Sequence, residues 1–452
     1  MILDKDSPIR MYNKGYAYYD SGCIYEWQPG KMPEYTGWAD EEMSWKTDCY
    51  LGDWTLSLTD LWISGKDAIR FFEDTCSNSF AKFPVGVGKH YMMCHDDGTV
   101  AAEGILLRLG EDQYCFQSNI WFPYYRYITN KDRYPDLKVE IPEAYPYGGQ
   151  INLVAKLFKF QIQGPKALAL AEKVTGKDLK SIKFMHFEEV EILGHKCIAL
   201  RQGMSGEIGF EIQGPIEHGK EIYQHIFEMG EEFNCRRLGT RTSMINHLEA
   251  CYPTGGVHFL PPVMDDYYAW QQESWGKPFM HTVYGSYDGD ISYLACNPYE
   301  LDWGMCVKFD HDFIGRDALE KLNGTPARKV VTLELNSQDM VEIYASLFDT
   351  EQEPFEILDV PMSPNFAMQA DKILDENGSL IGFASTPGYS LYFRKILSLS
   401  VIETKYSTPG TQVQVLWGSP GKRQRLIRAT VAPAPYKQDN RKVDLNAAPK
   451  QK

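Results

Sequence analysis

The sequence lacks the segments that carry a chain into or across a membrane. Its first 20 residues show no basic stretch followed by an apolar run, so no secretory signal is expected. No run approaches the roughly 18 uninterrupted apolar residues that a membrane-spanning helix needs. Its 10 cysteines are scattered singly from Cys23 to Cys306, without a CxxC pair or a Cys/His cluster at zinc spacing. We therefore predict a cytoplasmic protein with reduced thiols and no metal site.

Motifs for several common chemistries are missing too. There is no Walker A loop, no GxSxG nucleophile elbow and no HExxH zinc motif. The GVGKHY stretch at 86–91 lacks a third glycine and does not open a helix, so we predict no dinucleotide site. The histidines stand apart along the chain, and we interpret His90, His95 and His186 as structural or surface residues. The net charge of −15 argues against nucleic acid and anionic membranes as partners.

Aromatic residues, in contrast, are plentiful. They make up 13% of the chain and include 28 Tyr and 10 Trp. This content fits either a site for flat apolar ligands or large aromatic cores, and the composition leaves both open. An aromatic-rich stretch at about 261–300 has no clear periodicity, which predicts a long, loop-like and functional insert rather than a disordered one.

The pattern of strands and helices changes once along the chain. Up to about residue 250, strand-like stretches with DDG and GED turns are mixed with helical spacings, which is typical of an α+β fold. From about residue 328, short strands between turn signals indicate a separate small β-barrel. We therefore predict a catalytic region over 1–327, a barrel domain over 328–437 and a frayed tail over 438–452.

The stretch RQGMSGEIGFEIQGP at 201–215 combines glycines and acids in what otherwise has the pattern of a strand. Glu207, Gly209 and Glu211 are two residues apart, so on a strand they share one face. Glycine lets a backbone approach a flat ligand closely, and a carboxylate accepts two parallel N–H bonds. The stretch is therefore either a ligand-binding face or a surface hairpin with two solvated acids.

Four stretches occur in an order that points to one family. They are RQGMSGEIGFEIQGP, RRLGTRTSMINHLEA, NPYELDWGMCVKFDHDFIGRDAL and LIGFASTPGYS. Together they resemble the landmarks of the tetrahydrofolate-dependent aminomethyltransferase (glycine-cleavage T-protein) superfamily. Within it, FQIQGPKA, IYASLFDTE and QVLWG are similar to the bacterial aryl O-demethylases that act on vanillate and syringate. The resemblance covers nearly the whole chain.

The resemblance implies a fold, an activity and a cofactor. The fold is α+β, with two interleaved α+β domains around a central folate channel and a C-terminal β-barrel. The activity is transfer of a methyl group from a methoxylated aromatic compound to N5 of tetrahydrofolate, which gives 5-methyltetrahydrofolate and a phenol. Two alternatives stay open: a folate-dependent demethylase of an N- or S-methyl (onium) donor, and a non-catalytic folate-binding relative. The oligomeric state also stays open.

The resemblance also assigns roles to individual residues. Glu211 matches the acid that holds the pterin ring, and Glu103 matches the acid of the active site, which is usually Asp. The other assignments are cofactor binding for Glu207, Arg241 and Gln163, with Gln161 on the same strand, catalysis for Tyr25 and Tyr252, and a helix acid, as readily structural, at Glu249.

The substrate pocket departs from the demethylase pattern. The positions of its arginine, histidine and tyrosine are occupied by Asn119, Ser57 and Ser243, whereas its early tyrosine is kept as Tyr25. A benzoate carboxylate thereby loses its obvious cation, which Arg126 or Arg108 would have to replace. A phenolate leaving group needs a proton donor, whereas an onium leaving group needs none. The candidate donors are Tyr25, Tyr252, Tyr267, Tyr268 and Tyr284.

Overall fold

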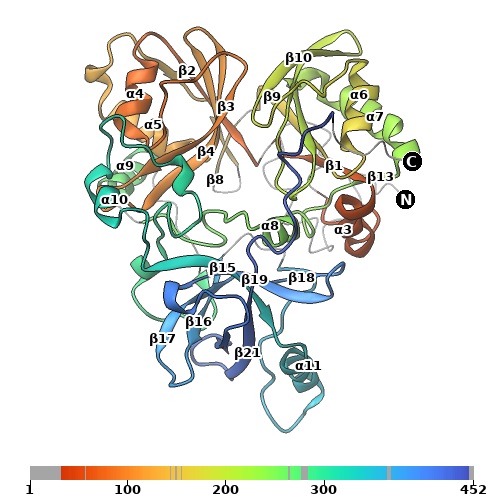
Figure 1. Cartoon of the computed structure of the whole chain (residues 1–452), viewed down its shortest axis with the longest axis vertical. Coiled ribbons are helices and arrows are strands. Elements are labelled where there is room, and N and C mark those ends of the chain that lie inside the picture. The colour runs from red at the N-terminus through yellow and green to blue at the C-terminus, as the bar shows by residue number, and fades with distance from the viewer. Residues whose placement is uncertain are drawn as a thin grey trace.

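The structure is a computed structural model that describes residues 32–55, 57–142, 144–147, 150–153, 155–262, 265–275, 283–363 and 368–446. Tyr25, which the resemblance assigns to catalysis and to substrate binding, lies outside the described residues. Two α+β lobes stand side by side above a β-barrel, and the short helix α8 (Ile245–Ala250) lies where these three parts meet (Figure 1). Within the described residues, no helix is both long and apolar enough to cross a membrane.

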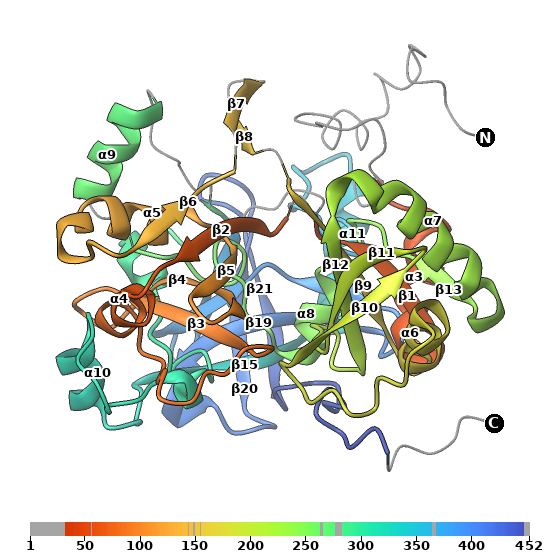
Figure 2. The same cartoon turned by 90° about the horizontal axis from the view of Figure 1, so that it is seen from above.

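The first lobe is built on a five-stranded antiparallel sheet with the strand order β3-β4-β5-β2-β6. Its strands are β2 (Thr59–Ser64), β3 (Gly88–Cys94), β4 (Val100–Gly110), β5 (Gln113–Ser118) and β6 (Lys138–Glu140). The same lobe carries α4 (Ala68–Thr75), α5 (Trp121–Ile128), α9 (Asp265–Trp275) and α10 (Arg316–Leu322), with the hairpin β7 (Ala144–Tyr147) and β8 (Gln150–Leu153) above it (Figure 2).

The second lobe is built on a six-stranded sheet with the strand order β10-β11-β12-β9-β1-β13. Its strands are β1 (Cys49–Asp53), β9 (Leu157–Gln163), β10 (Phe187–Ile192), β11 (His195–Leu200), β12 (Gly209–Pro215) and β13 (Cys235–Arg237). Its helices are α3 (Trp38–Thr47), α6 (Ala167–Thr175) and α7 (Gly219–Gly230). Short 3-10 helices elsewhere in the chain span Lys131–Arg133, Ile216–His218, Glu231–Phe233, Ile291–Leu294, Gly304–Cys306, Ser346–Phe348 and Thr404–Tyr406.

Strand β1 ties the two lobes together. It lies between β9 and β13 in the six-stranded sheet, antiparallel to β9 and parallel to β13. The chain then crosses directly to β2, which pairs with β5 and β6 in the five-stranded sheet of the first lobe. It returns to the six-stranded sheet only at β9. The two lobes are therefore interleaved, which confirms the predicted α+β arrangement.

The C-terminal part forms the predicted β-barrel. Six strands follow the order β16-β17-β19-β15-β21-β20, and pairing of β16 with β20 closes the ring. They are β15 (Arg328–Leu335), β16 (Met368–Leu374), β17 (Leu380–Ser385), β19 (Lys395–Glu403), β20 (Gln412–Trp417) and β21 (Arg425–Ala432). Strand β18 (Gly388–Ser390) extends along β19, β14 (Val283–Tyr284) along β16, and α11 (Ser337–Ala345) lies at the far end (Figure 1).

The aromatic-rich insert contains a helix where the sequence pattern indicated a loop. In α9, Tyr267 and Trp270 are three residues apart and therefore share one side of the helix. Their rings lie 5.1 and 5.5 Å from the ring of Tyr125 on α5, and the Tyr125 hydroxyl donates a hydrogen bond of 2.7 Å to Asp266. Contact with α5 thus stabilises a helix whose own sequence has little amphipathic pattern.

The described part of the predicted tail packs against the second lobe instead of fraying. The Asn440 backbone N–H donates a hydrogen bond of 2.9 Å to the carbonyl of Gly206, and the Lys437 ammonium pairs with Glu207. Leu445 is 3% exposed and belongs to the same apolar core as the six-stranded sheet. One buried leucine and these polar contacts therefore hold residues 437–446 against the glycine-rich stretch.

Both faces of the six-stranded sheet are buried, and they differ in chemistry. Alternate side chains of β9 pack against α6 and α7 in an apolar core, namely Phe158, Phe160 and Ile162. The side chains between them are polar and just as buried, namely Lys159, Gln161 and Gln163. Because the period of a strand is two residues, all three lie on the face opposite the apolar core.

Two contacts join this polar face to the inner face of the five-stranded sheet. Lys159 pairs with Asp60 on β2 at 3.0 Å, and both side chains are almost completely buried. The side-chain amides of Gln213 on β12 and Gln117 on β5 exchange two hydrogen bonds of 2.8 Å. We call these four residues the interlobe polar seam.

We predict that Lys159→Met lowers the free energy of unfolding by about 3–5 kcal/mol, because it leaves the Asp60 carboxylate buried without its cation. The control is Lys177→Met, whose pair with Glu188 is 44% and 39% exposed and should contribute less than about 1 kcal/mol. Urea unfolding of the two variants checks this prediction. A Lys159 variant no less stable than the Lys177 variant would contradict it.

Candidate active site

Glu211 lies at the centre of the polar face of the second lobe. It is on β12, its side chain is fully buried, and its strand neighbour on β9 is Gln161. One carboxylate oxygen accepts a hydrogen bond of 2.6 Å from the Gln213 amide and the other accepts one of 2.7 Å from the Gln202 amide. Burial raises the pKa of Glu211, against the opposing effects of these amides and of the Lys159 charge. Each oxygen of the Glu211 carboxylate thus accepts one hydrogen bond from a side-chain amide.

A cavity of about 200 Å³ lies beside the interlobe polar seam. Its wall includes the polar side chains Gln117, Gln213, Glu189 and Lys196 and is otherwise mostly apolar, with Trp62, Leu107, Leu109, Leu157 and Ile198. Gln213 both lines this space and donates a hydrogen bond to Glu211, so it links the cavity to the buried carboxylate.

The glycines of the 201–215 stretch allow its backbone to pack closely against side chains of β9 and against the backbone of the same stretch. A Cβ at Gly203 would lie 1.9 Å from the Gln163 amide nitrogen, and one at Gly209 would lie 2.8 Å from the carbonyl oxygen of Gln202. Gln163 holds this turn: it donates to the carbonyl of Glu207 and accepts from the backbone N–H groups of residues 204 and 205. It also accepts a hydrogen bond of 2.8 Å from the Tyr50 hydroxyl. In the structure Gln163 therefore supports the loop next to Glu211.

Glu103 belongs to a second polar centre, on the first lobe. Its carboxylate lies 2.9 Å from Nε2 of His90, and Nδ1 of that imidazole lies 3.8 Å from the Cys306 thiol. Burial disfavours the charged form of His90, but hydrogen bonds to Cys306 and Glu103 and the charge of Glu103 outweigh burial and raise its pKa to about 10. The imidazole is therefore expected to be an imidazolium at neutral pH.

Two aromatic rings lie beside this centre. The ring of Trp303 stands edge-on to the His90 imidazole at 4.9 Å, and the Tyr252 ring lies 6.3 Å from it. Burial raises the pKa of the Tyr252 hydroxyl above its usual value, with the Glu103 charge acting in the same direction. Tyr252 is thus a neutral hydroxyl beside the Glu103–His90 pair, whereas the imidazolium is the stronger acid.

The contact between His90 and Glu103 was not predicted from the sequence, although a signal for it was present. The DDG turn predicts a hairpin, and in the structure β3 and β4 pair with Met92 opposite Glu103. His90 lies two residues before Met92, so it is on the same face and diagonal to Glu103. Pairing the two predicted strands across the turn would have brought the acid and the imidazole together. Gln202 and Gln213 carried no comparable signal.

Three other predicted residues have structural partners. Glu207 pairs with Lys437 and accepts a hydrogen bond of 3.1 Å from Asn440. Arg241 pairs with Glu34 at 2.6 Å and with Asp359 at 3.0 Å, so it links the start of α3 to the barrel domain. Glu249 accepts from Trp45, Lys46 and Ser390. Each has partners within the protein, although Nε of Arg241 is buried without a hydrogen-bond partner among the described residues, and a direct folate contact of Glu207 or Arg241 stays a prediction.

The predicted substrate positions vary in exposure. Ser57 and Asn119 are exposed, and the Asn119 side chain accepts a hydrogen bond of 3.2 Å from the backbone N–H of Trp121. Ser243 is 4% exposed and donates to the carbonyl of Thr240 at 3.0 Å. Their contact with a substrate stays a prediction.

The two replacement arginines differ in availability. Arg108 already has hydrogen-bond partners, because its guanidinium donates to the backbone carbonyls of residues 83, 110 and 111. Arg126 lies over the ring of Phe122, and its Nε and one Nη are buried without a hydrogen-bond partner among the described residues. Arg126 is therefore the better candidate cation for a substrate carboxylate.

Comparison with known proteins assigns the family. Residues 17–259, more than half of the chain, match the GCVT N-terminal domain. The structure is similar to that of the glycine cleavage system aminomethyltransferase T of Bartonella henselae, with a TM-score of 0.64 at 16% identity over 94% of this chain and 97% of that one. The fold is therefore that of the glycine-cleavage T-proteins. The chain belongs to the GCVT family, and the predicted one-carbon transferase family is confirmed.

Three relatives with assigned names are similar over most of their length. "Sesamin methylene transferase" of Sinomonas sp. (strain No.22) is 29% identical over 92% of this chain and 93% of its own. "Syringate O-demethylase" of Sphingobium sp. (strain NBRC 103272 / SYK-6) is 29% identical over 90% of each. "Aminomethyltransferase" of Caldanaerobacter subterraneus subsp. tengcongensis is 27% identical over 78% of this chain and 77% of its own. The predicted likeness to aryl O-demethylases is thereby confirmed.

We predict that His90 titrates with a pKa of about 10 in the folded protein, against about 6.5 in the unfolded chain. Because the folded pKa is raised, its stabilising contribution is complete below about pH 6.5 and is lost as the pH rises through 10. NMR of protein labelled with ¹³C in histidine, with His90→Gln for assignment, measures the folded pKa. A His90 signal that titrates near pH 6.5 would contradict the proposed ion pair with Glu103.

Proposed function

We propose that this protein moves a methyl group from a methoxylated aromatic compound to N5 of tetrahydrofolate, giving 5-methyltetrahydrofolate and a phenol. The observation that carries the proposal is a pair of polar centres: a buried carboxylate with an N–H donor on each oxygen at Glu211, and a partly exposed Glu103–His90 pair beside aromatic rings. The name of the relative from Sphingobium, a syringate O-demethylase, supports the aromatic methyl ether as the donor class.

The residues around Glu211 fit a pterin. The 2-amino group and the neighbouring ring N–H of a pterin form one edge with two parallel donors, the arrangement that a carboxylate accepts in a bidentate manner. In the structure the amides of Gln202 and Gln213 supply two such donors to the two oxygens. A pterin edge on Glu211 would take their place, and the flexible amides would turn to other partners.

Tetrahydrofolate, when bound, supplies the nucleophilic nitrogen that accepts the methyl group. The chain's own residues then have to stabilise the departing phenolate. A phenol has a pKa of about 10, and a general acid works best when its pKa is matched to its task. The His90 imidazolium, with a pKa of about 10, is matched to such a leaving group. Glu103 accepts a hydrogen bond from Nε2–H and keeps the imidazole charged, so the proton given to the phenolate would come from Nδ1, which lies 3.8 Å from the Cys306 thiol.

The same observation argues against an onium methyl donor. A sulfonium or quaternary ammonium leaving group departs without a negative charge, so such a substrate would make no use of the proton on His90. A carboxylate on the aromatic ring is compatible with the structure, since Arg126 offers a cation with two unpartnered nitrogens among the described residues.

The function is tested under anoxic conditions with purified protein, tetrahydrofolate and a panel of donors. The panel contains methoxyarenes with and without a carboxylate, onium compounds and a donor of a methylene group, because one relative is named a methylene transferase. Formation of 5-methyltetrahydrofolate from a methoxyarene is expected. Turnover of only onium or methylene donors would replace the proposed donor class, and no turnover together with no tetrahydrofolate binding would refute the proposal.

We predict that Glu211→Gln weakens tetrahydrofolate binding by about 100-fold, because two hydrogen bonds to a charged acceptor are lost. Isothermal titration measures the dissociation constant. The matched control is Glu191→Gln, an exposed acid on β10 of the same sheet, which should bind like the wild type. Equal affinity of the Glu211 variant and the control would show that Glu211 does not hold the pterin.

We predict that His90→Gln lowers kcat by about 100-fold or more with a methoxyarene whose phenol is a weak acid, because a general acid contributes roughly 10²–10⁴. The loss should shrink with a nitro-substituted methoxyarene, whose phenolate leaves without a proton. Single-turnover rates across a series of leaving groups test this dependence. A loss that is the same for every leaving group would assign His90 a structural role only.

A further inference from the structure

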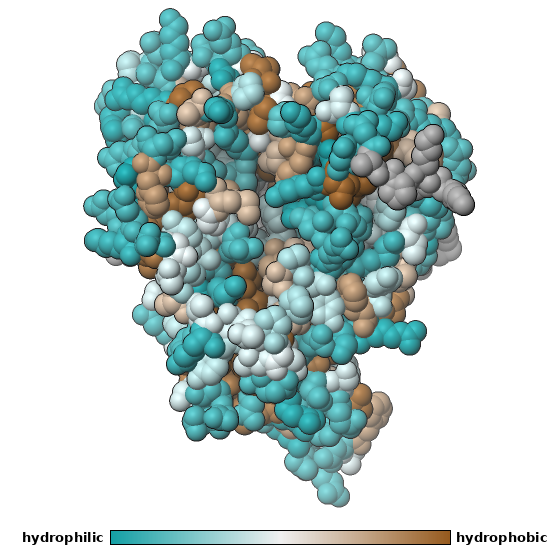
Figure 3. All heavy atoms as spheres, viewed as in Figure 1, coloured by the Kyte–Doolittle hydropathy of each residue, from teal (hydrophilic) through white to brown (hydrophobic). Residues whose placement is uncertain are grey.

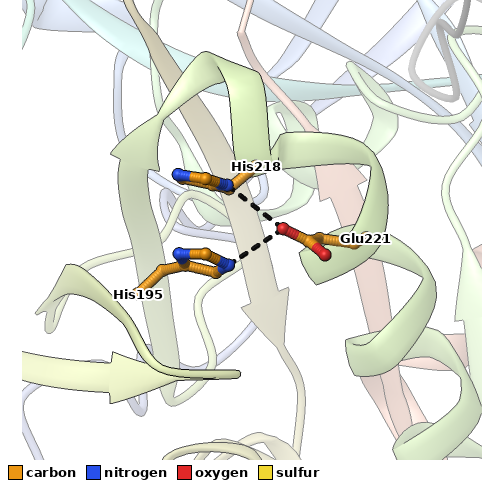
Figure 4. A group of neighbouring side chains, drawn as sticks. All are labelled: His195, His218 and Glu221. Carbon is orange, nitrogen blue, oxygen red and sulfur yellow. Dashed lines mark hydrogen bonds and ion pairs between the residues drawn. The ribbon is translucent and has the colours of Figure 1, made fainter.

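Two histidines and a glutamate meet at the edge of the second lobe, away from Glu211. Nε2 of His195 lies 2.9 Å, and Nδ1 of His218 lies 3.1 Å, from the same carboxylate oxygen of Glu221 (Figure 4). The two imidazole rings are stacked, with centroids 3.6 Å apart and planes at 14°. All three possible ligand atoms lie within 4.8 Å of one another.

Secondary structure holds these residues together although they are distant in the sequence. His195 opens β11 directly after the tight turn at Leu193 and Gly194, both of which have positive φ. On β11, Ile198 pairs with Gln213 of β12, and continuing this register places His195 beside Ile216, two residues before His218. Glu221 follows in the first turn of α7. The group therefore joins a hairpin, a 3-10 helix and a helix.

We propose that His195, His218 and Glu221 bind one divalent transition-metal ion of the zinc type. Both imidazoles already direct a nitrogen toward one carboxylate oxygen, so small rotations of the rings bring three lone pairs onto one ion. Two His nitrogens and a carboxylate are a ligand set that zinc uses, with bonds of about 2.0–2.2 Å and a fourth position for water. Imidazole nitrogen favours Zn²⁺, Co²⁺, Ni²⁺ and Cu²⁺ over Mg²⁺ and Ca²⁺.

The sequence predicted no metal site, because positions 195, 218 and 221 match no spacing motif. The site is also separate from the proposed chemistry. Glu211 pairs with Leu200, which lies five residues along β11 from His195, a distance of about 16 Å. A metal here would fasten the β10–β11 hairpin to the start of α7, and it would stabilise the lobe without taking part in methyl transfer.

The test is titration of the full-length protein, freed of metal by a chelator, with zinc chloride in a non-chelating buffer. We expect one ion with a dissociation constant on the order of micromolar and a rise in the unfolding temperature of about 2 °C or more. His195→Ala, His218→Ala and Glu221→Gln should each weaken binding at least about tenfold. All three side chains are partly exposed, so the variants should fold. His225→Ala, on the same helix one turn further on, is the control and should bind normally.

Thiols are the competing ligands, since the described residues include nine free cysteines. Cobalt therefore serves as the second probe: nitrogen and oxygen ligands give weak visible bands, whereas thiolates add an intense near-ultraviolet band. Loss of the visible bands in His195→Ala and His218→Ala would support the site. Zinc affinity unchanged in these variants, a thiolate band in the wild type, or binding weaker than millimolar would overturn the proposal.

Discussion

The interlobe polar seam is the constraint on which the rest of the structure depends. One face of the six-stranded sheet packs against helices through apolar side chains. The other face carries polar side chains that are also buried. Buried polar groups are tolerated only when each has a partner. The pairs of Lys159 with Asp60 and of Gln213 with Gln117 supply partners from the other lobe and set how the two sheets face each other. The seam thereby places Glu211 in an environment without bulk water.

In the proposed reaction the two centres would have different roles. Glu211, on the second lobe, is a carboxylate that already holds two N–H donors and so suits a ligand with a donor edge. His90, on the first lobe, is kept charged by Glu103 and suits a leaving group that becomes negative. Methyl transfer requires the acceptor, the methyl carbon and the leaving oxygen in one line. The contacts of the seam fix the two lobes relative to each other, and would thereby fix the relative positions of the two centres.

The sequence was sufficient for the fold, and less so for the contacts within the candidate site. Period-two strands, turn signals and four landmarks in order predicted the interleaved lobes and the barrel. The helix α9 was missed because its aromatic residues depend on contact with Tyr125, which lies far away in the sequence. The Glu103–His90 pair required the register of a hairpin, and the partners of Arg241 and Glu207 lie in the barrel domain and in the tail. Such long-range pairing leaves no local pattern.

The most direct measurement is a crystal structure of the protein with 5-methyltetrahydrofolate. The pterin edge should lie on the Glu211 carboxylate, with the Gln202 and Gln213 amides turned away from it and the methyl group directed toward His90. A pterin bound elsewhere, with the Gln202 and Gln213 amides still on Glu211, would contradict the role given to the polar face.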